Sequence, residues 1–158
     1  MATWLITGCS AGLGRALAAA ILDRRENVVV TARHAAAAQD LARARPGTAL
    51  ALPLDVTDHA RIRAVVRAAR ERFGTIDVLV NNAGHSYRAA VEEAADDQVQ
   101  ELFATNFFGP GALIQAVLPG MRAQRSAAAR SSASPRSGPA VPPSGPATTR
   151  PARPRWKP

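Results

Sequence analysis

The sequence predicts an α/β protein with a doubly wound, parallel sheet. Short apolar runs of strand length alternate with longer segments of helical spacing over residues 1–120. Residues 28–30 are Val-Val-Val, which is typical of a parallel strand that helices cover on both faces. Glycines and polar residues follow the first and the fourth apolar runs, at the strand ends where ligands bind in such sheets.

The first part of the chain supplies three strands. Residues 4–7 form a short buried strand that ends in a glycine-rich turn. Residues 12–24 follow as a helix, whose apolar face is predicted to hold Leu13, Leu17, Ala20 and Ile21. Three further elements come before residue 55: a strand at 27–32, a helix at 35–45 that Pro46-Gly47 stops, and a strand at 48–54 that Pro53 weakens.

The second part adds two long helices around a fourth strand. Residues 57–73 form an Arg-rich helix capped by Thr57 or Asp58, with Ile62, Val65, Val66 and Ala69 on its apolar face. Residues 76–80 form the strand. A helix over 97–118 ends at Pro119-Gly120 and is predicted to bury Leu102, Phe103 and Leu113. Strict alternation of strands and helices implies right-handed crossovers.

The composition changes after residue 125. Residues 126–158 hold eight of the 12 prolines and are otherwise mainly Ala, Ser, Arg and Gly. Such a segment buries too little surface to offset its conformational entropy. We therefore expect an incomplete, four-stranded domain at residues 1–125 and a disordered basic tail at residues 126–158.

Charge and cysteine content narrow the classes of partner. The net charge of +8 comes from the region after residue 120, because the 12 arginines and 12 acidic residues before it cancel. The tail has one aromatic residue, Trp156, so nucleic-acid binding through the tail is the least favoured function. No apolar stretch reaches the roughly 20 residues of a membrane span. Together with the single Cys9, this leads us to expect a cytoplasmic protein without a membrane partner.

Two motifs point to a nucleotide. Residues 7–14 read Thr-Gly-Cys-Ser-Ala-Gly-Leu-Gly between the first strand and its helix, where backbone N–H groups and the helix dipole favour a phosphate. Residues 81–84 read Asn-Asn-Ala-Gly after the fourth strand. Each motif alone is compatible with an ordinary turn, and it is their pairing at two strand ends that indicates a binding site.

With both motifs, residues 2–125 resemble the short-chain dehydrogenase/reductase family, which has a Rossmann fold and moves hydride between a nicotinamide dinucleotide and a carbonyl or alcohol substrate. The resemblance implies that the turn binds the dinucleotide through Thr7, Gly8, Cys9, Ser10, Gly12, Leu13 and Gly14. It implies that Asp55 and Val56 contact adenine and that Asn82, Ala83 and Gly84 lie beside the ribose and nicotinamide. Intact members of the family can be oligomers.

Three residues keep an alternative interpretation. Arg33 ends the second strand where NAD enzymes carry an acid, so it favours the 2′-phosphate of NADP over NAD, unless it is a solvated surface arginine. Asn106 matches the asparagine of the family's catalytic tetrad, or is an exposed helix residue. Cys9 is either a thiol activated at a helix N-terminus or a small buried residue of the turn. No metal site is predicted, since His34, His59 and His85 lack ligand spacing.

The catalytic tyrosine and lysine of the family have no counterpart. The only tyrosine is Tyr87, followed four residues later by Val91, and the only lysine is Lys157. We therefore predict an oxidoreductase sequence without activity, or alternatively a non-catalytic nucleotide-binding remnant. A frameshift after about residue 126 is one hypothesis for the tail. When the possible codons of the tail are translated in a frame shifted by one base, they can encode the family's Tyr-x-x-x-Lys motif.

Overall fold

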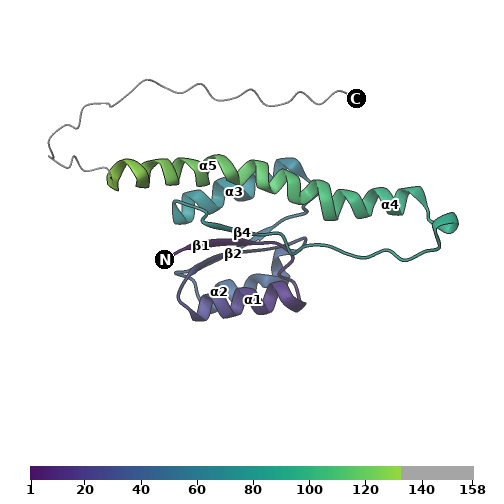
Figure 1. Ribbon diagram of the computed structural model, residues 1–158. Helices are drawn as coiled ribbons and strands as arrows, with labels where there is room; N and C mark the ends of the chain where they lie inside the picture. The colour runs from purple at the N-terminus through teal and green to yellow at the C-terminus, as the bar shows by residue number, and fades with distance from the viewer. Residues whose placement is uncertain (133–158) are drawn as a thin grey trace, which may run out of the picture.

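The computed structural model describes residues 1–132, with side chains placed to residue 125. Within this part a parallel sheet in the order β3-β2-β1-β4 lies between two layers of helices (Figure 1). The strands are β1 (Thr3–Ile6), β2 (Asn27–Ala32), β3 (Ala49–Pro53) and β4 (Val78–Val80). One face is covered by α1 (Gly12–Asp23) and α2 (Gln39–Ala44), the other by α3 (His59–Phe73) and α5 (Gly109–Ser132). The doubly wound parallel fold is confirmed.

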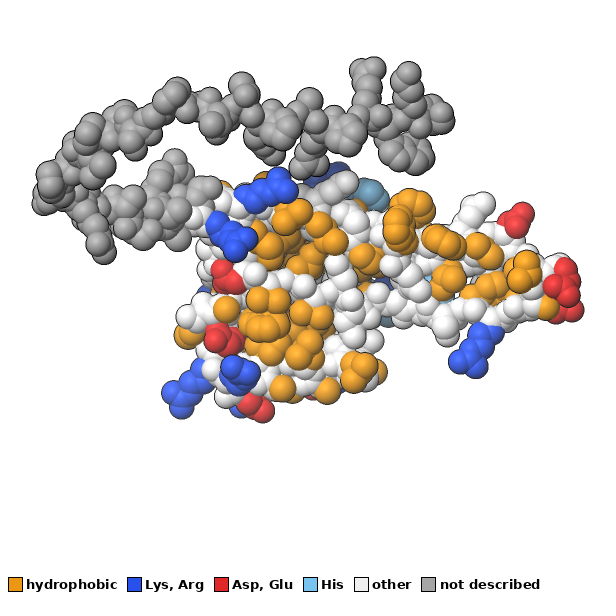
Figure 2. Space-filling view, in the orientation of Figure 1, with side chains coloured by type: hydrophobic (Ala, Val, Ile, Leu, Met, Phe, Trp, Pro, Cys, Tyr) orange, Lys and Arg blue, Asp and Glu red, His pale blue; other side chains and the backbone are white. Residues whose placement is uncertain are grey.

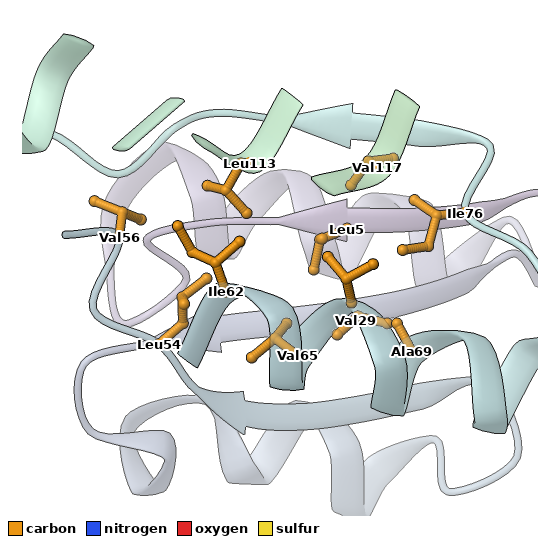
Figure 3. Close-up of a cluster of buried hydrophobic side chains, with 11 residues drawn as sticks. Leu5, Val29, Leu54, Val56, Ile62, Val65, Ala69, Ile76, Leu113 and Val117 are labelled. Atoms are coloured by element: carbon orange, nitrogen blue, oxygen red, sulfur yellow. The ribbon is translucent and has the colours of Figure 1, made fainter. Parts of the chain in front are cut away.

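Successive side chains of each strand point to opposite faces of the sheet, so the strands contribute to a hydrophobic core on each face. Leu5 and Val29 face the α3 and α5 side, where they meet Ile62, Val65, Ala69, Leu113 and Val117 (Figure 3). Ile6, Val28 and Val30 face α1 instead. Apart from the half-buried Trp4 and Asn27, both faces of β1 and β2 are buried, which explains why these strands are nearly continuous apolar runs in the sequence.

Helix α3 follows the prediction in its face and its start. Its buried residues are the predicted Ile62, Val65, Val66 and Ala69. Asp58 is the N-cap, and its carboxylate accepts a hydrogen bond of 2.9 Å from the backbone N–H of Arg61. Because both signals are local in sequence, they could be read without knowledge of the neighbouring elements.

The predicted face of α1 was wrong except at Ile21, which is buried, whereas Ala20 is exposed. Leu13 is 84% exposed and Leu17 is 38% exposed, and the residues that the helix buries are Gly14, Ala18, Ile21 and Leu22. Gly14, at the start of this helix, lets the helix backbone approach the ends of β1 and β4. The neighbouring large side chains, Leu13 and Leu17, therefore point to the surface.

The long second-half helix is interrupted where it was predicted to be regular. It begins as α4 (Asp96–Phe103), passes through a π-helical turn, η3 (Ala104–Phe108), and continues as α5. Pro119 lies inside α5, so the predicted end at Pro119-Gly120 was wrong. Leu113, Val117 and Met121 pack on one core from both sides of Pro119, and this burial holds the helix together across the missing backbone donor.

Two 3₁₀ turns complete the described part. The predicted helix over 35–45 divides into a 3₁₀ turn, η1 (Ala35–Ala38), and α2. A second 3₁₀ turn, η2 (Val91–Glu93), precedes α4, which projects beyond the sheet (Figure 1). Phe103, predicted to be buried, is 50% exposed on this projecting arm, and Leu102 is half-buried.

Two predictions concern the end of the chain. The expected domain boundary at residue 125 falls inside α5, which runs on to Ser132. The rest of the predicted disordered tail lies outside the described residues. Within the described part, the stretch Asp96–Arg125 is long and apolar enough to cross a membrane by length and composition alone, with 22% of its apolar window buried. Its Leu113 and Val117 pack into the core as those of a sheet-covering helix do.

Candidate functional site

The ends of β1 and β4 are joined by the Thr7 hydroxyl. Its Oγ1 accepts hydrogen bonds from the backbone N–H groups of Asn82 (3.0 Å) and Ala83 (2.9 Å) and donates to the Val80 carbonyl (3.3 Å). The Asn82 amide Nδ2 donates in return to the carbonyls of Thr7 (2.9 Å) and Gly8 (3.1 Å). The two sequence motifs therefore form one hydrogen-bonded unit.

Two glycines permit this close approach. A Cβ on Gly8 would lie 2.9 Å from the Ala83 Cα, and Gly8 also has a positive φ of 73°. A Cβ on Gly14 would lie 2.6 Å from the Gly8 carbonyl oxygen and would overlap the Asn82 side chain. Any side chain at either position would separate α1 from the strand ends.

The first turn of α1 opens toward the same place. Its N-cap is Ala11, whose side chain provides no capping acceptor, so the first backbone N–H groups of the helix are left for another partner. Gly12 has a φ of 60° and nothing lies within 4 Å of where its Cβ would be. Together with the exposed Ser10, this forms an open, electropositive concavity suited to a phosphate.

A cavity of about 690 Å³ lies over the carboxyl ends of the strands. Nine of the predicted cofactor-binding residues line it: Gly8, Ser10, Gly12, Arg33, Asp55, Val56, Asn82, Ala83 and Gly84. Its size and its position at the topological switch between β1 and β4 are those expected of a nucleotide site.

Charged side chains lie at the end of the cavity beside β2 and β3. Asp55 Oδ1 accepts hydrogen bonds from the Thr57 backbone N–H (2.9 Å) and hydroxyl (2.7 Å). These two bonds, and more weakly the charge of Arg33, hold the pKa of Asp55 below its usual value. The site therefore presents a fixed carboxylate and an exposed guanidinium along one wall.

The other predicted residues of the turn support the cavity without lining it. Thr7 and Gly14 are buried in the junction described above, and Leu13 points to solvent. The Cys9 thiol is fully buried and donates to the Ile6 carbonyl (3.3 Å). Burial raises the pKa of this thiol, so the structure favours the small buried residue over the activated thiol.

Asn106 lies in the π-helical turn, close to the cavity but outside its lining. Its side-chain Nδ2 donates to the His85 carbonyl (2.7 Å), and its Oδ1 accepts from the His85 backbone N–H (3.1 Å). The amide thus fixes the chain directly after the Asn-Asn-Ala-Gly motif. Tyr87, in the same segment, has its hydroxyl oxygen bonded to the Ala95 backbone N–H (3.2 Å).

Sequence reasoning missed seven residues of the cavity wall. They are Ala11, Ala32, Leu54, Thr57, His85, Glu101 and Thr105. Most of these adjoin a motif, and Thr57 could have been found as a hydroxyl two residues after Asp55. Glu101 and Thr105 share a helix face at i and i+4, but only the fold shows that this face meets the cavity. Among the described residues, no three His, Cys, Asp or Glu side chains gather as metal ligands would.

Comparisons with known proteins agree with this geometry. A family model described as short chain dehydrogenase matches residues 2–133. The chain is 39% identical over 125 residues to an oxidoreductase of Botryotinia fuckeliana, covering 78% of this chain and 45% of that protein. It is 41% identical over 130 residues to dehydrogenase/reductase SDR family member 7B of Bos taurus, covering 77% of this chain and 40% of that protein.

Solved structures give the same picture. A short-chain dehydrogenase from Streptomyces avermitilis superposes with a TM-score of 0.75 at 44% identity, over 78% of this chain and 45% of that one. L-sorbose reductase from Gluconobacter frateurii, complexed with NADPH and L-sorbose, has a TM-score of 0.71 at 32% identity, over 78% of this chain and 48% of that one. The chain thus spans less than half the length of these relatives.

Proposed function

Because this chain belongs to the short-chain dehydrogenase family, whose members are NAD(P)-dependent oxidoreductases, we propose that its cavity binds NADP(H) and that these 158 residues alone complete little or no hydride transfer. The observation that supports binding is the junction of Thr7 with Asn82, which brings the glycine turn and the Asn-Asn-Ala-Gly segment onto one cavity. In the family, the bound dinucleotide supplies or accepts the hydride.

The residues present fit the diphosphate. The uncapped start of α1 offers backbone donors, and Gly12 leaves open space beside them. Ser10 and Gly12 both line the cavity there. We assign the diphosphate to this end, where the helix dipole and the N–H groups offset its charge. The adenosine then lies toward Arg33 and Asp55, and the nicotinamide toward Gly84 and His85.

Arg33 favours NADP over NAD. It is exposed at the cavity and follows β2 directly, at the place where an acidic residue would bind a ribose 2′-hydroxyl. A guanidinium pairs with a 2′-phosphate through charge-assisted hydrogen bonds. Asp55 lies within electrostatic reach of Arg33, and the two hydrogen bonds from Thr57 hold its carboxylate in place.

The tyrosine and lysine that transfer the proton in the family have no counterpart among the residues of the described site. Tyr87 is the only tyrosine, its hydroxyl oxygen is bonded to the Ala95 N–H, and no lysine follows it by four residues. Asn106 positions the backbone of His85 and is the one residue here that matches the family's catalytic set. Loss of a general acid or base costs on the order of 10²- to 10⁴-fold in rate.

Calorimetry and a turnover assay on the 158-residue chain test both parts. NADPH should bind, whereas NADPH oxidation over a panel of aldehydes and ketones should stay near the uncatalysed rate. Arg33→Asp should weaken NADPH by roughly ten- to a hundredfold, the cost of a hydrogen bond to a charged group, and leave NADH within about threefold. Arg43→Asp, an exposed change on α2 away from the cavity, is the matched control.

Three results would contradict the proposal. If the folded chain takes up no nicotinamide dinucleotide, the assigned function fails. Turnover comparable to that of full-length relatives would show that another group replaces the tyrosine and lysine. An unchanged NADPH affinity in Arg33→Asp would reduce Arg33 to a surface residue.

A further inference from the structure

The cavity has a second carboxylate that neither motif includes. Its formally charged lining residues are Arg33, Asp55 and Glu101. The first two come from the ends of β2 and β3, but Glu101 comes from α4, some 46 residues further along the chain than Asp55. A carboxylate on this wall repels phosphate, so it constrains which part of a dinucleotide can lie beside it.

Glu101 lies on the part of the cavity wall that the α4 helix supplies. Glu101 and Thr105 are one helical turn apart and both line the cavity, so this face of the helix is turned inward. Further along the same helix, Gly109 packs on Val56, where a Cβ would lie only 2.8 Å from the Val56 carbonyl oxygen. Val56 therefore links this helix to the Asp55–Thr57 end of the cavity that Glu101 also lines.

Under the proposed function, that end holds the adenine. The exocyclic 6-amino group of adenine has two N–H donors and no negative charge, so carboxylates on facing walls can accommodate it. Thr57 already donates twice to Asp55 Oδ1, whereas the exposed Glu101 carboxylate has no hydrogen bond or ion pair with another described residue. Glu101 thus offers acceptor oxygens from the side opposite the strand ends.

We propose that Glu101 is a specificity-determining residue, which accepts a hydrogen bond from the adenine 6-amino group and disfavours a purine with a carbonyl at that position. The inference rests on the proposed function, because it takes the dinucleotide as the ligand. Since Glu101 is exposed, its contribution is that of a solvated charged acceptor and not that of a buried ion.

Calorimetry with two probes tests this on the full chain. The probes are NADP⁺ and its analogue with hypoxanthine in place of adenine, which carries a carbonyl where adenine has the amine. The wild type should prefer NADP⁺ by about three- to tenfold, a typical value for one exposed charge-assisted hydrogen bond. Glu101→Gln keeps the length of the side chain but adds an amide donor, so the preference should fall below about twofold.

Glu93→Gln is the matched control, because it removes the same charge from the turn before α4 without touching the cavity. It should leave the preference of the wild type unchanged. If Glu101→Gln retains the full preference for adenine, the role of Glu101 is refuted while dinucleotide binding stands. If the wild type binds neither probe, the proposed function and this inference fail together.

Discussion

The cavity has two walls that are built in different ways. The wall at the ends of β1 and β4 is buried and closely packed: Thr7 and Asn82 exchange four hydrogen bonds across it with neighbouring backbone, and Gly14 has no room for a methyl group. The wall formed by α4 and its π-helical turn is exposed. Phe103, Phe107 and Phe108 are half or more exposed there, and hydrophobic side chains remain uncovered along this arm (Figure 2).

This difference separates binding from the rest of the reaction. The packed wall is complete within residues 1–84 and contains both motifs. The open wall is linked to the packed one mainly through Asn106 to His85 and through Gly109 against Val56. Large apolar side chains at a surface are typical of a face that other polypeptide covers, and the matched residues make up less than half of the relatives' length. We expect substitutions in the packed wall to cost more than those in the open wall.

The largest loss of unfolding free energy is expected for Gly14→Ala. The new methyl group would overlap the Gly8 carbonyl and the Asn82 side chain, so α1 must move away from the strand ends. Overpacking of this kind costs about 3 kcal/mol of unfolding free energy, which urea denaturation followed by circular dichroism would measure. Gly47→Ala is the control, since nothing lies within 4 Å of its Cβ position, and equal effects of the two changes would contradict the tight junction.

Thr7→Val should lower the unfolding free energy somewhat less than Gly14→Ala does. Valine keeps the shape of threonine but leaves the N–H groups of Asn82 and Ala83 without their acceptor. Unsatisfied groups in a buried place cost about 2 kcal/mol in all once some water reaches them, and NADPH affinity should fall as the two motifs separate. Thr7→Ser, which retains the hydroxyl, should recover most of both. A valine variant with wild-type stability would show that the hydroxyl does not join the strands.

The packed wall is also the part that could be predicted from sequence. The limits of β2, the buried face and N-cap of α3 and nine residues of the cavity all follow from local patterns, which need no knowledge of distant neighbours. The errors have a common physical origin. The face of α1 was assigned to its large apolar residues, but Gly14 and Ala18 are buried because the helix must approach the sheet closely.

The open wall is the part of the site that could not be predicted from the sequence. Phe103 looks like a core residue by its type, but its exposure depends on whether other polypeptide covers α4, which no local pattern contains. Pro119 looks like a helix end, but burial of Val117 and Met121 on either side keeps the helix intact. Glu101 and Thr105 could not be assigned to the cavity for the same reason, since their role depends on how the arm is placed.

The smallest loss is expected for Asn106→Ala, although this residue makes two well-formed hydrogen bonds to His85. Both bonds are exposed, so water replaces them when the side chain is removed, and the net cost is about 1 kcal/mol or less. NADPH affinity should change by less than about threefold, because the diphosphate lies on the packed wall and Asn106 itself does not line the cavity. Asn106→Asp retains the acceptor for the His85 N–H and should cost less again. A loss in Asn106→Ala as large as that in Thr7→Val would mean that the open wall supports the fold and the site as strongly as the packed wall, and the difference between the two walls would no longer hold.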